Sequence, residues 1–145
     1  MHCMLRLGTG APATPVGVHR LQYLVDDTRL DNGLRVVVNP DAMAPGVAVN
    51  LWYRVGSADE SPGCTGFAHL FEHLMFAGST NVENGEHLAA IQAVGGSVNA
   101  TTSFDRTNYF ETVGPQALDL ALWLEADRMS GLNVDQNNLD TQREV

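Results

Sequence analysis

The sequence predicts an α+β fold, a two-layer sandwich in which helices pack on one face of a mainly antiparallel sheet. Segments with strand character are joined by short turns and not by helical crossovers, and such turns connect antiparallel neighbours. The segments with helical periodicity follow in blocks, so the order is strands, helix, helix, hairpin, helix, helix. Hairpins without crossovers are typical of the α+β class.

Two stretches are expected to form antiparallel hairpins. In residues 21–40, the turn dipeptide Asn32-Gly33 separates two segments that read as strands, which indicates a tight hairpin turn. In residues 97–113, a second pair of strands turns near Asp105. The apolar segment 46–56 reads as a further strand, central to the sheet.

Four helices are expected, and glycines mark where three of them end. The ranges are 66–77, 84–94, 115–130 and a fourth from residue 135. Gly78, Gly95 and Gly131 follow the last periodic residues of the first three. Asn84 is expected to cap the second helix and Asp135 the fourth.

The composition is that of a globular protein. Of the 145 residues 44% are hydrophobic and 17% are charged, which separates the chain from disordered and fibrous classes. The formal net charge of −9 argues against nucleic-acid binding, because nothing offsets repulsion by the phosphates. Two cysteines do not make a disulfide framework, and so few favour a reducing compartment.

The N-terminal residues read differently from the rest of the chain. We expect a flexible leader at 1–19 and a single domain at 20–145. The leader lacks the apolar core that a signal peptide needs, and no run approaches the roughly 18 apolar residues of a membrane span. The sequence therefore predicts a cytoplasmic protein without a membrane span.

The first helix carries three ionisable side chains within five residues. At 100° per residue, His69, Glu72 and His73 share one arc of about 100°. The remaining arc is apolar and is expected to pack into the core, with Leu70, Phe71, Leu74 and Met75. A polar stripe on a buried helix is costly unless its groups are paired or bind a metal ion.

This pattern fits a zinc site. Two imidazoles one turn apart can direct nitrogens at one Zn²⁺, and Glu72 beside them can take a proton from a zinc-bound water. The order H-x-x-E-H is the inverted form of the H-E-x-x-H protease motif. The alternative is a hydrogen-bonded structural trio without metal. Cys64 is a conceivable extra ligand, whereas His87 is expected at the surface.

Four separated segments resemble one protein family. They are LDNGLRVVV, YRVGSADESPGCTGFAHLFEHLMFAGS, GGSVNATTSFDRTNYFETVGP and LWLEADRM. In this order they are similar to the zinc metallopeptidases that include pitrilysin, insulin-degrading enzyme and the mitochondrial processing peptidase, particularly to bacterial processing-peptidase-like members.

The resemblance implies a Zn²⁺-dependent metalloendopeptidase that cleaves extended or unfolded peptides. Its zinc ligands would include His69 and His73, and Glu72 would be the general base. The segment SVNATTS would be an edge strand that adds the substrate as a further strand, with Asn99, Ala100 and Thr101 near the scissile bond. Without the resemblance, these three residues read as an ordinary edge strand.

The resemblance also implies that part of the catalytic domain lies outside the chain. The family takes its third ligand from a glutamate well downstream of the second histidine. Glu144 lies close to that position, but its register favours a ligand beyond Val145. Residues 20–145 would then be most of an N-terminal catalytic domain, truncated at its C-terminal end and inactive alone. Family members also pair homologous domains around the peptide.

Two other functions remain open. S-ribosylhomocysteine lyase uses the same inverted motif with a cysteine as third ligand, but no cysteine follows Cys64. The chain could also be a non-catalytic peptidase-like partner or assembly module, which would bind a homologous domain or a second copy.

Overall fold

The computed structural model describes residues 24–143, which divide into two compact units that meet between Ala42 and Met43. The first unit is an antiparallel hairpin of β1, Asp26–Arg29, and β2, Arg35–Val38. Its turn contains Gly33 with φ of 88°, a left-handed conformation that favours glycine. The hairpin predicted around Asn32-Gly33 is therefore confirmed.

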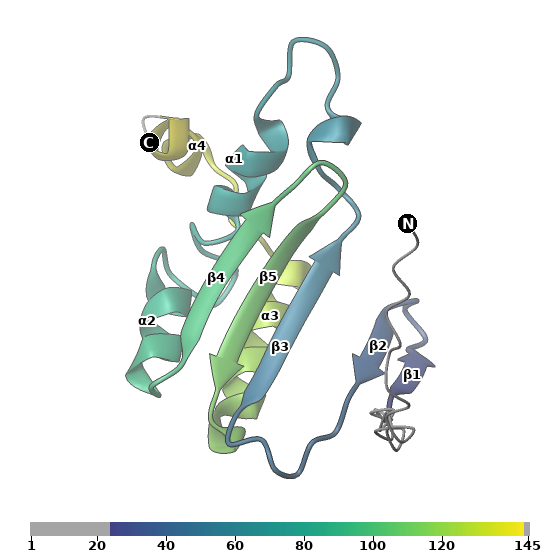
Figure 1. Cartoon of the computed structure of the whole chain (residues 1–145). Coiled ribbons are helices and arrows are strands. Elements are labelled where there is room, and N and C mark those ends of the chain that lie inside the picture. The colour runs from purple at the N-terminus through teal and green to yellow at the C-terminus, as the bar shows by residue number, and fades with distance from the viewer. Residues whose placement is uncertain (1–23, 144–145) are drawn as a thin grey trace, which may run out of the picture. The chain divides into compact units, whose positions relative to one another are not determined.

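The second unit contains a three-stranded antiparallel sheet in the order β3-β5-β4 (Figure 1). Its strands are β3, Val47–Tyr53; β4, Ser97–Thr102; and β5, Thr107–Val113. The β4–β5 hairpin turns between Thr102 and Thr107, as the sequence predicted. The central strand β5 is buried at nearly every position, because β3 and β4 flank it on both edges.

Four α-helices accompany this sheet. They are α1, Phe67–Leu74; α2, Glu86–Ala93; α3, Leu118–Ser130; and α4, Gln136–Arg143, with short 3₁₀ turns at Ser57–Asp59 and Pro115–Ala117. In Figure 1, α3 runs along the back of the three strands, and α2 lies beside β4. The α+β prediction is confirmed, although the described strands form two antiparallel sheets where one was expected.

The core of the second unit lies where α2 and α3 meet the sheet. Six buried side chains form it: Val82, Ile91, Val113, Ala117, Ala121 and Leu124. The backbone at Gly96 belongs to the same packing, because a Cβ there would approach the Ile91 side chain and the Thr112 carbonyl at 2.9 Å. The site helix α1 also buries a side chain of its own, Leu74, of which 1% is exposed.

Several details of the helices differ from the prediction. The first helix ends at Leu74, and the second is capped by Gly85 instead of Asn84. Phe71 was expected in the core but is 47% exposed and lines an apolar hollow beside α1. The Asp135 cap is confirmed, since its Oδ1 accepts the Asn138 N–H at 2.7 Å. Among residues 24–143, no helix combines the length and apolarity that crossing a bilayer requires.

Asp127 on α3 ties down the turn that follows α1. Its carboxylate accepts the Ser79 hydroxyl at 2.6 Å, the Asn81 side-chain amide at 2.6 Å and the Asn81 backbone N–H at 3.1 Å. The Ser79 hydroxyl, then the two Asn81 donors, hold the pKa of this carboxyl below its usual range. The ionised form therefore stabilises the fold above the unfolded-state pKa of about 4, and this contribution is lost as pH falls through the lower folded-state pKa.

We expect Asp127→Asn to lower the free energy of unfolding at pH 7, with a difference from wild type that shrinks as pH falls below about 4. Urea denaturation at several pH values measures both quantities. The control is Asp119→Asn, since Asp119 is an exposed carboxylate on the same helix. A loss that is the same at pH 3 and pH 7 would contradict the prediction.

Candidate active site

The N-terminus of α1 is held by a carboxylate from the preceding loop. The capping residue is Gly66, with φ of 92° and no side chain to accept the first free N–H groups. Glu60 replaces that cap, because its two carboxylate oxygens accept the N–H groups of Gly66 at 3.0 Å and Ala68 at 2.9 Å. A negative charge here also complements the helix dipole. Glu60 thereby fixes the turn immediately before His69.

The two histidines of the motif converge. His69 Nε2 and His73 Nε2 lie 3.2 Å apart, and the ring centroids are separated by 4.8 Å. Two nitrogens that bind one tetrahedral zinc at about 2.0–2.1 Å are themselves ~3.3 Å apart. The observed separation matches that of such a donor pair, and it is also the length of a hydrogen bond between the two rings.

Glu72 lies on the same side of α1 and reaches the sheet. The Thr102 hydroxyl, at the end of β4, donates a hydrogen bond to Glu72 Oε2. Glu72 is half-buried, whereas His69 is exposed. The carboxylate is thus held against the end of β4.

A pocket of about 620 Å³ opens beside these groups. Its lining includes His69 and Glu72 from α1, Thr101 and Thr102 from β4, and Glu60 and Phe104 from the flanking loops. Phe104 is exposed at the tip of the β4–β5 hairpin. The pocket therefore joins the motif helix to the end of the β4 strand.

The predicted substrate-binding residues lie on an edge strand. Within the described residues, β4 pairs only with β5, so its other edge is open. Along β4 the side chains of Asn99 and Thr101 are exposed, whereas Ala100 is buried. The Ala100 N–H is bonded to its neighbour's Asn99 Oδ1 at 2.8 Å, which occupies a donor that an added strand could use. Of the three residues, Thr101 reaches the pocket.

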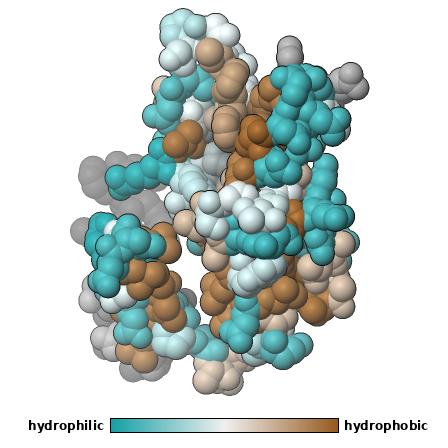
Figure 2. All heavy atoms as spheres, turned by 180° about the vertical axis from the view of Figure 1, so that it is seen from behind, coloured by the Kyte–Doolittle hydropathy of each residue, from teal (hydrophilic) through white to brown (hydrophobic). Residues whose placement is uncertain are grey.

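Two other candidate ligands are not placed with the histidines. Cys64 is exposed and lines a separate apolar hollow of about 530 Å³, together with Phe67, Phe71 and Met129. Figure 2 shows the second unit from behind the sheet, where hydrophobic residues are exposed between hydrophilic ones. Glu144 lies outside the described residues.

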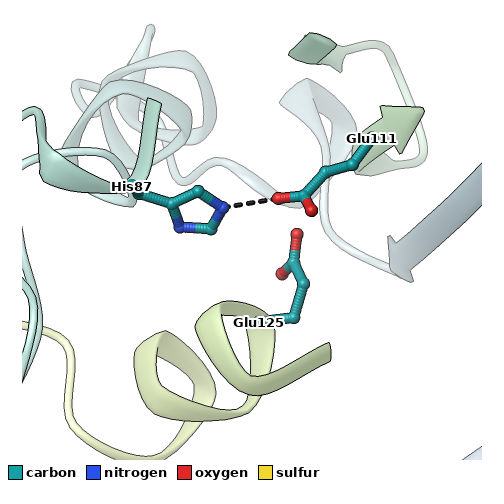
Figure 3. A group of neighbouring side chains, drawn as sticks. All are labelled: His87, Glu111 and Glu125. Carbon is teal, nitrogen blue, oxygen red and sulfur yellow. Dashed lines mark hydrogen bonds and ion pairs between the residues drawn. The ribbon is translucent and has the colours of Figure 1, made fainter. Parts of the chain in front are cut away.

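His87 was predicted at the surface, and this is wrong: 4% of it is exposed. Its Nε2 lies 2.5 Å from Glu111 Oε1, and Glu125 approaches the same point from α3 (Figure 3). One ligand atom from each of the three lies within 4.8 Å of the others, a spacing that a metal ion could use. However, Arg128 already donates to both Glu125 oxygens, at 2.5 and 2.7 Å, and compensates its charge. The group therefore reads as a buried ion network.

The network changes the pKa of Glu125 and leaves two buried polar atoms without partners. Burial raises the pKa of the Glu125 carboxyl, although Arg128 acts to lower it. Arg128 also stacks 4.3 Å above the ring of Tyr109 and 5.2 Å above that of Phe76. Within the described part of the chain, Glu111 Oε2 and Arg128 Nη1 are buried without a hydrogen-bond partner. Removing any one of these charges would leave another charge buried without compensation, which destabilises the fold.

The sequence held signals for these missed residues. Thr107, Tyr109, Glu111 and Val113 alternate along β5 and all face the core, so a glutamate at that phase requires a buried partner. Thr102 has the same phase on β4 as the buried Ala100 and therefore faces α1. The signal for Glu60 was weaker. The helix begins at Gly66, which has no side chain to cap it, so a polar group from elsewhere in the chain is needed there.

A helix that carries H-x-x-E-H with converging histidine nitrogens, next to an open strand edge, is the arrangement of the zinc enzymes with the inverted motif. Residues 35–145 match the family described as insulinase, peptidase family M16, and the chain belongs to this family.

The most similar proteins include bacterial and mitochondrial members. The zinc protease PqqE of Helicobacter pylori is 38% identical over 131 residues, which cover 88% of this chain and 30% of that protein. The probable mitochondrial-processing peptidase subunit beta of Arabidopsis thaliana is 31% identical over 118 residues, 81% of this chain and 22% of that protein. The match to a peptidase family favours the peptidase prediction over the lyase.

Solved structures agree with the fold. A protease from Helicobacter pylori superimposes with a TM-score of 0.81 at 36% identity, covering 85% of this chain and 30% of that one. Pitrilysin gives a TM-score of 0.78 at 29% identity, covering 83% of this chain and 13% of that one. The chain thus spans less than a third of the length of these relatives.

Proposed function

We propose that this chain is the N-terminal catalytic part of a zinc metalloendopeptidase, with residues 20–145 forming most of the catalytic domain. The observation that carries the proposal is the 3.2 Å separation of the His69 and His73 nitrogens, with Glu72 held beside them on the same helix. The zinc site is proposed for this chain, and peptide cleavage for the whole protein that contains it. A third protein ligand is needed for a catalytic zinc site, and it comes from outside the described residues.

The residues divide the reaction between them. His69 and His73 would hold zinc, which when bound polarises the scissile carbonyl and acidifies a water. Glu72 accepts a proton from the attacking water and later returns it to the leaving amine. The Thr102 hydroxyl binds one carboxylate oxygen, Oε2, which leaves Oε1 to take up and return the proton.

The substrate would be an extended or unfolded peptide added along the open edge of β4. The backbone N–H and C=O of Ala100 would pair with the peptide, because Asn99 and Thr101 on either side of it turn their backbone groups toward β5. The exposed side chains of Asn99 and Thr101 would flank the peptide, and backbone pairing requires little of its side-chain sequence. Because the Ala100 N–H is held by Asn99 in the free chain, the Asn99 side chain must rotate away for that bond to form. A cytoplasmic location remains a prediction from the sequence.

The zinc site is tested by elemental analysis of the whole protein that contains this chain, after dialysis against zinc-free buffer. We expect about one zinc per chain in wild type, and its loss in His69→Ala and His73→Ala, because each removes one of two converging nitrogens. Glu72→Gln is the matched control, since it alters the same helix face without removing a proposed ligand. Near-zero zinc in the wild-type whole protein would contradict the proposed site.

A further inference from the structure

Thr102 is the side chain of the sheet that touches the proposed general base. It is the last residue of β4, and its hydroxyl donates to Glu72 Oε2 across the gap between strand and helix. The two residues are separated by 30 positions in the chain, so the contact depends on the packing of α1 against β4. Strand alternation places Thr102 on the inner face, whereas its neighbour Thr101 is exposed.

The surroundings of Thr102 determine where its only hydroxyl proton goes. Thr107 is its partner across the hairpin, and the two hydroxyl oxygens lie 3.4 Å apart. Thr107 donates its own proton to the Val55 carbonyl at 2.9 Å, so it cannot also donate to Thr102. The Thr102 proton can then go to Thr107 or to Glu72, and a carboxylate is the stronger acceptor. The hydrogen bond is therefore directed at Glu72.

A glutamate side chain on a helix surface can rotate about three torsions. A hydrogen bond from a donor on the sheet restricts these rotations. With Oε2 held by Thr102, Oε1 is the oxygen left for a water in the pocket that Glu72, His69 and Thr102 line together. A proton-transfer group is effective only within about 2.6–3.2 Å of the proton it takes, so its orientation affects the rate.

We propose that Thr102 is a positioning residue for Glu72, which it orients toward the attacking water. This inference rests on the proposed function. Thr102 directly follows the strand residues proposed to bind the peptide, so the residue that orients the base and the residues that bind the substrate lie on the same strand.

The kinetic test compares Thr102→Val, which keeps the shape but removes the hydroxyl, with Thr102→Ser, which retains it. In the whole protein we expect the valine variant to lose kcat on the order of tenfold, the value of one hydrogen bond to a charged group. KM and zinc content should stay at wild-type values, and serine should restore kcat. The control is Thr112→Val on β5, at an exposed position away from the pocket. Unchanged kcat in Thr102→Val, or no recovery with serine, would overturn the proposal.

A second measurement does not depend on turnover. NMR side-chain couplings of Glu72 in the metal-free chain report whether it occupies one rotamer or averages over several. We expect one rotamer in wild type and Thr102→Ser, and averaging in Thr102→Val at an unchanged melting temperature. Averaging already in wild type would overturn the positioning role. A fixed Glu72 in a protein without Glu72-dependent turnover would instead refute the proposed function and leave the contact intact.

Discussion

Glu72→Gln is expected to reduce peptide cleavage by a factor on the order of 10²–10⁴ while leaving bound zinc unchanged. Glutamine keeps the size of the side chain and can still contact the Thr102 hydroxyl, but it cannot take a proton from water at neutral pH. The metal is retained because the converging nitrogens belong to His69 and His73. The expected result is therefore a loss of kcat with an intact metal site.

The measurement is cleavage of an internally quenched, unstructured peptide by the whole protein, together with elemental analysis of the same sample. Glu83→Gln provides the matched control, since Glu83 is an exposed glutamate that does not line the pocket beside the motif. Turnover close to wild type in Glu72→Gln would remove the general-base assignment. Loss of zinc in that variant would instead make Glu72 a ligand.

Arg128→Met is expected to destabilise the fold by about 3–5 kcal/mol, the usual effect of breaking a buried ion pair. The Arg128 side chain is 1% exposed and supplies both hydrogen bonds to Glu125. Methionine would fill part of the volume against Tyr109 and Phe76, but it would leave Glu125 next to Glu111 without the guanidinium that binds both of its oxygens. Two carboxylates cannot both remain ionised in such a site without strong repulsion.

The pH dependence of this loss follows from Glu125. Burial already raises the pKa of that carboxyl, and removing Arg128 removes a charge that lowers it. A group whose pKa is raised in the folded state contributes stability below its unfolded-state pKa, near 4.3, which is lost as pH rises through the folded-state pKa. Chemical denaturation should therefore show a larger loss at pH 8 than at pH 5.

Two further variants make the test specific. Arg35→Met breaks the exposed pair between Arg35 and Asp27 and should leave stability unchanged, because solvent screens such pairs. The double variant Glu125→Leu with Arg128→Met removes both charges and should recover much of the loss. A loss in Arg128→Met no greater than that in Arg35→Met, or no recovery in the double variant, would show that the network carries little stability.

The local features of this protein could be predicted from its sequence. Helical periodicity placed His69, Glu72 and His73 on one arc, and the structure brings the two histidine nitrogens within 3.2 Å. The same local rules predicted the Asn32-Gly33 hairpin, the β4–β5 hairpin and the Asp135 cap. These features depend on residues a few positions apart, whose relation is set by backbone geometry.

Only the tertiary structure determined which distant groups meet these elements. The Glu60 cap of α1, the contact of Thr102 with Glu72 and the burial of His87 each depend on how helices pack on the sheet. His87 could not be recognised as buried from its own helix, because what draws it inward is Glu111 on β5, 24 residues away. The sequence alone therefore placed the chemical groups of the candidate site on one side of a helix, whereas the packing of α1 and α2 against the sheet determined which groups they meet. The physical reason is that a charged or polar side chain is stable inside a protein only beside a partner, and local periodicity does not identify that partner.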